Sequence, residues 1–155
     1  MASTVTASTM TVTISESITL NGKNQGGTQT LSIPSIATVS RRIIDVPASE
    51  ITLVSMGTAV SNGQYIESDV LYIRITNLDD TNHVTLLFKN EDNNEYAVKL
   101  DKGQTFIYNG DLADGVVDTM DAGATALTIG LSDLVNITAT ANTAACDLEL
   151  FIACK

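Results

Sequence analysis

Residues 71–108 read LYIRITNLDDTNHVTLLFKNEDNNEYAVKLDKGQTFIY, and this stretch decides the fold class of the 155-residue chain. Apolar and polar residues alternate in four short runs, which are separated by polar or glycine-containing turns. Alternation with a period of two is typical of strands that bury one face. The turns are too short to hold crossover helices, so the strands are expected to pair mostly antiparallel, as in a β-sandwich or barrel.

Alternation of the same kind continues on both sides of this stretch. Further strands are expected over residues 11–20, 28–33, 37–46, 51–56, 127–131, 135–139 and 146–154. Pro34 and Pro47 are expected to end the second and third of these strands. The chain is therefore predicted to be an all-β, antiparallel, jelly-roll-like β-sandwich of about ten strands with little or no helix. Residues 1–10 would form an N-terminal arm and residues 11–155 a single sandwich domain.

Alternation also assigns side chains to faces in two of the strands. In residues 70–75, one face is expected to carry Leu71, Ile73 and Ile75, and the other Val70, Tyr72 and Arg74. In the first strand, the apolar face carries Val12, Ile14, Ile18 and Leu20. Glu16 falls on this apolar face and interrupts it. A β-bulge or an edge position at Glu16 would let the carboxylate reach water.

Composition limits the partners that the chain can bind. Hydrophobic residues make up 44% and charged residues 17%, which indicates a globular rather than a disordered chain. Eighteen acidic residues oppose eight Lys and Arg, for a net charge of -10. Phosphate backbones and anionic membranes both require Lys and Arg, so neither nucleic acid nor a membrane is expected as a partner. The acidic balance fits an outer, solvent-facing surface.

The start of the chain has no pattern of a secretory signal. Residues 1–10 lack a basic region followed by an apolar one. No apolar run approaches the roughly 20 residues that a membrane helix needs. We therefore expect the protein to be made and kept in a cytoplasm until assembly.

The two cysteines, Cys146 and Cys154, fall on the same face of the last expected strand. The strand between them spans about 26 Å, far beyond the reach of a disulfide. The chain has one histidine and no C-x-x-C, so neither a metal pair nor a redox pair is indicated. We expect two buried thiols that pack as small hydrophobic groups.

No pattern points to catalysis, and the chain is expected to be neither an enzyme nor the holder of a cofactor. His83 follows an acidic turn with no nucleophile or second base indicated nearby, so it is expected to be an exposed residue at the start of a strand. P-loop, G-x-G-x-x-G and G-x-S-x-G motifs are absent from the sequence. Paired carboxylates of the glycosidase kind stay open in so acidic a chain, although sugar grooves usually contain aromatic residues and this chain has no Trp.

The segment over residues 109–123 departs from the alternation and is interpreted as a long acidic loop. It carries the carboxylates of Asp111, Asp114, Asp118 and Asp121. Their spacing lacks the D-x-D-x-D-G pattern of an EF-hand. Two interpretations stay open: a solvated loop, which is preferred, or a calcium site if the carboxylates converge in space.

The opening residues 2–10 are polar, nearly uncharged and β-prone. One interpretation is a frayed terminus. The other is an arm that packs on a neighbouring subunit, in which case Val5, Met10 and Val12 are the candidate assembly contacts. An ordered arm held within its own chain stays open as well.

Three short motifs carry a resemblance to a known class of proteins. They are YIRITNLDDTN at residues 72–82, GQTFIY at residues 103–108 and ITATAN at residues 137–142. Together they resemble small β-sandwich structural proteins of tailed phages, notably marine ones, in which similar strands enter a hairpin and lead to the C-terminal strand. The resemblance covers about residues 70–155.

This resemblance implies a jelly-roll-like subunit of the virion. The expected role is a capsid decoration or cement protein on the outer surface of the capsid, with the major capsid protein or other virion proteins and its own copies, as a homotrimer, as partners. The class has contact surfaces rather than catalytic residues, so no site residues carry over.

A second class of function is a carbohydrate- or receptor-binding module of a tail fibre or spike, with calcium in the acidic loop as an option. The tyrosines available for stacking against a sugar are Tyr65, Tyr72, Tyr96 and Tyr108. The lack of Trp weighs against this alternative, and a small hydrolase is weaker still.

Overall fold

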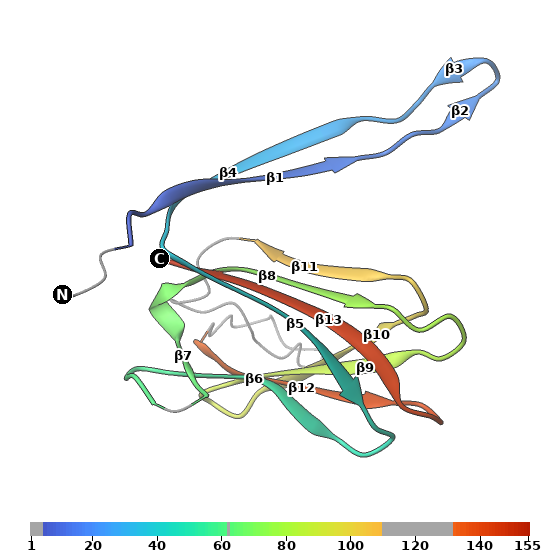
Figure 1. The fold of residues 1–155 in the computed structure, drawn as a ribbon. Helices are drawn as coiled ribbons and strands as arrows, with labels where there is room; N and C mark the ends of the chain where they lie inside the picture. The colour runs from blue at the N-terminus through green and yellow to red at the C-terminus, as the bar shows by residue number, and fades with distance from the viewer. Residues whose placement is uncertain (1–4, 62, 110–131) are drawn as a thin grey trace, which may run out of the picture.

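Two β-sheets pack face to face and a long hairpin extends away from them, as Figure 1 shows. The computed structural model describes residues 5–61, 63–109 and 132–155. Within these residues the chain is all-β, and one 3₁₀ turn over Glu67–Asp69 is its only helical element. The expected antiparallel β-sandwich is confirmed, whereas the jelly-roll-like topology stays a prediction.

The first sheet has four strands and the second has five. In spatial order the first contains β11 (Thr105–Asn109), β8 (Val70–Asn77), β13 (Cys146–Cys154) and β5 (Thr38–Val46). The second contains β10 (Glu95–Leu100), β9 (Val84–Asn90), β12 (Leu134–Ala141), β6 (Ile51–Gly57) and β7 (Tyr65–Ile66). Every neighbouring pair is antiparallel except β6 and β7, so the expected mostly antiparallel pairing is confirmed.

The main core fills the space between the inner faces of the two sheets. Its centre is Phe88 of β9, which is fully buried and stacks on Tyr96 with ring centroids 4.8 Å apart. Phe106 and Tyr108 of β11 lie 4.9 and 5.8 Å from the same ring, so aromatic side chains from both sheets meet there. Interleaved rings of this kind hold the sheets together by burial and by edge and offset contacts.

Both cysteines lie on the inner face of β13 and are buried and free, as expected. Burial raises the pKa of the Cys154 thiol to about 11 and also raises that of Cys146. Both thiols therefore stay protonated at neutral pH and pack as apolar groups.

The faces assigned to the start of β8 were wrong for two residues. Val70 is fully buried in the main core, and Leu71 packs beside Tyr72 on the opposite face. The cause is an irregularity in the pairing with β13, where Ala153 is opposite Tyr72 but Cys154 is opposite Val70. An extra residue on one strand reverses the direction of every side chain before it.

Residues 8–36 are arranged differently from the expectation. The sequence placed an arm at residues 1–10 and the sandwich from residue 11 onward. In the structure, β1 (Ser8–Ser15) and β4 (Thr28–Ile36) pair with each other, and β2 (Thr19–Leu20) and β3 (Lys23–Asn24) continue this pair to its tip. These strands belong to neither sheet of the sandwich. We call residues 8–36 the arm hairpin.

Proline does not end β4, contrary to the expectation. The strand continues through Pro34 to Ile36, with a register shift opposite Ser8 and Met10 and a positive φ of 65° at Ser35. A proline is tolerated here because a hairpin strand has a free edge where its missing N–H is not needed. The strand expected over residues 127–131 lies outside the described residues.

Candidate assembly surface

The base of the arm hairpin is held by a small second core. Ile33 and Ile36 of β4 are buried there with Tyr72 and Ala153. Partly buried around them are Met10, Val12, Leu31, Leu71, Ile107 and Phe151. The arm hairpin is thus attached to the face of the four-stranded sheet that points away from the main core, which we call the outer face.

The arm hairpin then runs beyond the sandwich with its register unchanged. Ser15 is opposite Thr28, the amide of Glu16 donates to the carbonyl of Gly27 at 2.8 Å, and Leu20 is opposite Lys23. Its tip is a two-residue turn in which Asn21 and Gly22 have φ values of 51° and 77°. Such a turn matches the twist of the strands on either side of it.

One face of the arm hairpin carries an apolar row from the base to the tip. At the base, Met10 and Val12 are partly buried against the sandwich. Further along the same row, Ile14, Ile18 and Leu20 are 40, 48 and 54% exposed. Glu16 interrupts the row in a two-stranded ribbon with free edges, so the expected edge position is confirmed, while the bulge lies between Ser8 and Met10 instead.

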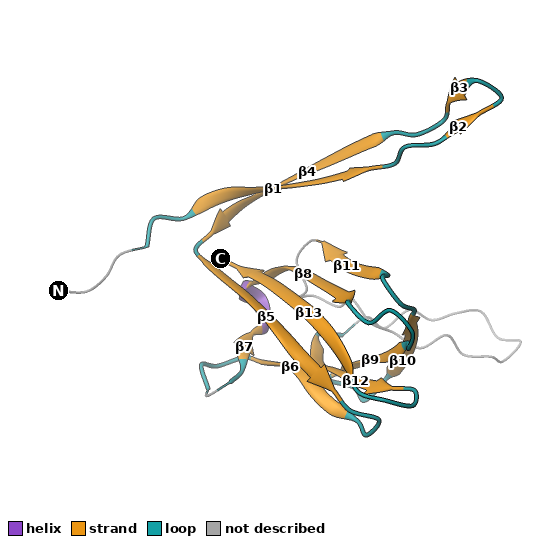
Figure 2. Ribbon diagram, turned by 45° about the vertical axis from the view of Figure 1, so that its right-hand side comes forward, coloured by secondary structure: helices purple, strands orange, loops and turns teal. Residues whose placement is uncertain are grey.

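Figures 1 and 2 both show the arm hairpin standing off the sandwich, with its tip farthest from it. A two-stranded ribbon is marginally stable in water when nothing covers its apolar face. The distal half of the arm hairpin, which we define as residues 13–28, therefore has the character of a contact element.

The outer face continues from the second core across to β5. Along β5 the side chains of Val39, Arg41 and Ile43 point to this face, since their partners on β13 are Ala153, Phe151 and Glu149. Val39 and Ile43 are 53 and 63% exposed. Among the described strands, β5 is the last of its sheet, so it also presents one unpaired edge.

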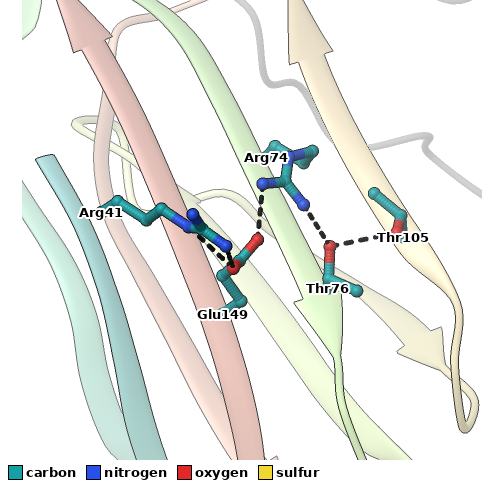
Figure 3. A network of polar contacts seen from close by, with 5 residues as sticks. All are labelled: Arg41, Arg74, Thr76, Thr105 and Glu149. Atoms are coloured by element: carbon teal, nitrogen blue, oxygen red, sulfur yellow. Dashed lines mark hydrogen bonds and ion pairs between the residues drawn. The ribbon is translucent and has the colours of Figure 1, made fainter. Parts of the chain in front are cut away.

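A polar network crosses the outer face beside these residues (Figure 3). The carboxylate of Glu149 on β13 accepts hydrogen bonds from Nε and Nη2 of Arg41 at 2.8 and 2.5 Å. Its other oxygen accepts one from Nη2 of Arg74 at 2.5 Å. Arg74 also donates to Thr76, whose hydroxyl lies 3.1 Å from that of Thr105. The network joins all four strands of the sheet.

Hydrogen bonds from Arg41, which has the larger effect, and from Arg74 lower the pKa of Glu149 below its ordinary value. The ionised Glu149, bonded to the two arginines, thus stabilises the fold above the unfolded-state pKa of about 4.3. This contribution is lost as the pH falls through the lower pKa of the folded state.

We expect Glu149→Gln to be less stable than the native chain at neutral pH, and the difference in stability to shrink on acidification. Urea unfolding midpoints across that range measure it, and a difference that grows toward acid pH contradicts this prediction.

A cleft of about 380 Å³ lies between the arm hairpin and the outer face. Its lining contains five consecutive residues of β1, Met10 to Ile14, together with Tyr72, Arg74, Ile107 and Phe151. Side chains alternate between the two faces of a strand. A lining of consecutive residues therefore means that the cleft is open to the edge of β1 and not to one face alone. Among the described residues, the contacts that form the second core join the base of the arm hairpin to its own sheet.

Charge is distributed unevenly between the arm hairpin and the rest of the chain. Residues 8–36 contain Glu16 and Lys23 as their charged residues, so the arm hairpin is neutral while the whole chain carries -10. Two copies of so acidic a protein repel each other over most of their surface. A neutral segment such as the arm hairpin avoids that cost when it approaches an acidic surface.

The other candidate residues do not form a shared site. His83 is half-buried rather than exposed and lies just before β9. In the part of the chain that the structure describes, no group of three or more His, Cys, Asp and Glu is placed to hold a metal ion. The acidic-loop candidates Asp111, Asp114, Asp118 and Asp121 lie outside the described residues.

The four tyrosines considered for sugar stacking are spread over different environments. Tyr96 and Tyr108 pack against the main core with their hydroxyls 3.2 Å apart, and Tyr65 packs against it elsewhere. Tyr72 is buried in the second core. This arrangement offers no exposed row of aromatic rings among the tyrosines, so nothing in it favours a carbohydrate site.

The assembly candidates named from the sequence divide between two settings. Met10 and Val12 contact the second core of their own chain, and Val5 is 64% exposed. The sequence predicts the apolar row of Ile14, Ile18 and Leu20 but not that it stands on a separate hairpin, although Asn21-Gly22 between two alternating runs is the strongest short hairpin pattern. No comparable sequence pattern marks Val39 and Ile43 as exposed residues of β5.

No protein-family model matches the chain, and no curated protein matches its sequence. Among the described residues, no helix is long and apolar enough to cross a membrane. The arrangement of the side chains therefore carries the functional interpretation.

Proposed function

We propose that this chain is a structural subunit of a phage particle, a capsid decoration or cement protein that binds the outer capsid surface and stabilises the shell. The observation that carries the proposal is the arm hairpin, a neutral ribbon whose apolar face extends beyond its own domain. The resemblance of residues 70–155 to phage β-sandwich proteins supports the same class.

The mechanism is stabilisation by mass action. A protein that binds the assembled shell but not its separated subunits shifts the equilibrium toward the shell. The rest of the chain is acidic and would face solvent on the outside, away from packaged nucleic acid, which an acidic surface repels. The partners are the major capsid protein or other virion proteins and further copies of this chain, as a homotrimer.

The proposal is tested on particles that carry this protein. Particles stripped of it are expected to lose their contents at a lower temperature than native particles, because the shell has lost the ligand that stabilises it. Release of nucleic acid on heating, followed with a fluorescent dye, measures the difference. Unchanged heat resistance after complete stripping contradicts a cement role.

A further inference from the structure

The distal row of the arm hairpin and the exposed row of β5 have matching patterns. On the arm hairpin, Ile14 of β1 is followed at every second residue by Glu16 and Ile18, which lie between β1 and β2 and keep the register through backbone hydrogen bonds with Gly27 and Gln25. On β5, three successive positions of the outer face are Val39, Arg41 and Ile43. Each row reads apolar, charged, apolar at the same spacing, and the central charges are opposite.

We propose that the distal half of the arm hairpin packs on the outer face of a second copy of this chain, with Ile14 and Ile18 against Val39 and Ile43 and the carboxylate of Glu16 against Arg41. This inference names a partner for the arm hairpin and rests on the proposed function only in treating it as an assembly contact.

The contact continues one that the chain already makes. At the base, Met10 and Val12 lie over the outer face of their own sheet. The same apolar row then leaves that sheet, and the outer face of a second copy offers the same kind of surface along β5. Packing the distal half there extends a geometry that the fold already uses.

The charges favour a second copy over a general apolar partner. Glu16 is misplaced on an apolar face unless a cation lies opposite, because an unpaired carboxylate costs free energy when it is buried. The side chain of Arg41 is 68% exposed, and its bonds to Glu149 use only two of its three nitrogens. A guanidinium has five donors in all, so it can hold a second carboxylate.

The test is self-association of the purified full-length protein in the absence of particles, measured by sedimentation equilibrium. The native chain is expected to associate. Ile43→Thr and Glu16→Lys are each expected to weaken association by roughly tenfold, the first by removing apolar contact and the second by placing a cation opposite Arg41. Both positions are exposed, so thermal unfolding should show that the variants are folded.

The charge variant separates this contact from general electrostatics. Glu16→Lys makes the chain less acidic, so weaker overall repulsion predicts tighter association, whereas the proposed pair predicts weaker association. Glu91→Lys makes the same change at an exposed turn, and Val60→Thr removes an aliphatic side chain that is 84% exposed. Neither control is expected to weaken association.

A monomeric native chain, or a Glu16→Lys variant that associates as tightly as the native chain, overturns the inference. The result is independent of the particle experiment. A chain that associates but adds nothing to the heat resistance of particles keeps this contact and removes the cement role. A monomeric chain that stabilises particles removes this contact and keeps the cement role.

Discussion

Replacing Phe88 by alanine is expected to lower the free energy of unfolding by about 3–5 kcal/mol, the typical cost of removing a fully buried phenylalanine. The ring is completely buried and has Tyr96, Phe106 and Tyr108 around it at 4.8 to 5.8 Å between centroids. Alanine would leave a cavity that three large rings from both sheets cannot close without moving the strands that carry them.

Urea unfolding measures this loss as a lower midpoint with an unchanged slope. Phe88→Leu is the matched control, because it keeps most of the volume and is expected to lose clearly less than the alanine variant. A loss below about 1 kcal/mol for alanine would mean that the aromatic cluster does not hold the two sheets together.

The second large effect is expected from Asn77→Ala at the end of β8. Asn77 is fully buried, and its amide donates to the carbonyls of Asn82 and Leu100 at 2.9 and 3.2 Å. Its side-chain oxygen accepts from the amide of Asp79 at 3.0 Å. Alanine would leave these backbone groups without their partner, for a loss of about 2–4 kcal/mol.

Urea unfolding again gives the magnitude, and hydrogen exchange at the amide of Asp79 gives the cause. That amide is expected to exchange much faster in the variant than in the native chain, since it loses its acceptor. An unchanged exchange rate together with an unchanged midpoint would show that the turn after β8 is held by other contacts.

Most of the sandwich could be predicted from the sequence, but its local irregularities could not. Alternation and turn residues predicted most strands of the sandwich to within a few residues, because a half-buried strand leaves a period of two in the sequence. The same pattern predicted two buried thiols on one face of β13. Periodicity does not encode a local irregularity, so the reversed faces of Val70 and Leu71 were missed.

The arm hairpin was missed for a different reason. An alternating strand looks the same whether it pairs inside a sandwich or in a ribbon outside it, and only tertiary contacts decide between them. In the sequence Glu16 interrupts an apolar face, and on the arm hairpin it is the charge in the middle of an exposed apolar row. Its counterpart Arg41 is placed by the pairing of β5 with β13, about a hundred residues later in the chain, which periodicity does not predict.

The proposed role of the arm hairpin is to be the element through which this protein assembles. It is tested most directly by adding purified protein back to stripped particles and measuring their heat resistance. The native chain and Val60→Thr are expected to restore it, whereas Ile14→Thr/Ile18→Thr, which alters only exposed side chains of the arm hairpin, is expected to restore little. Full restoration by the arm variant would contradict this role.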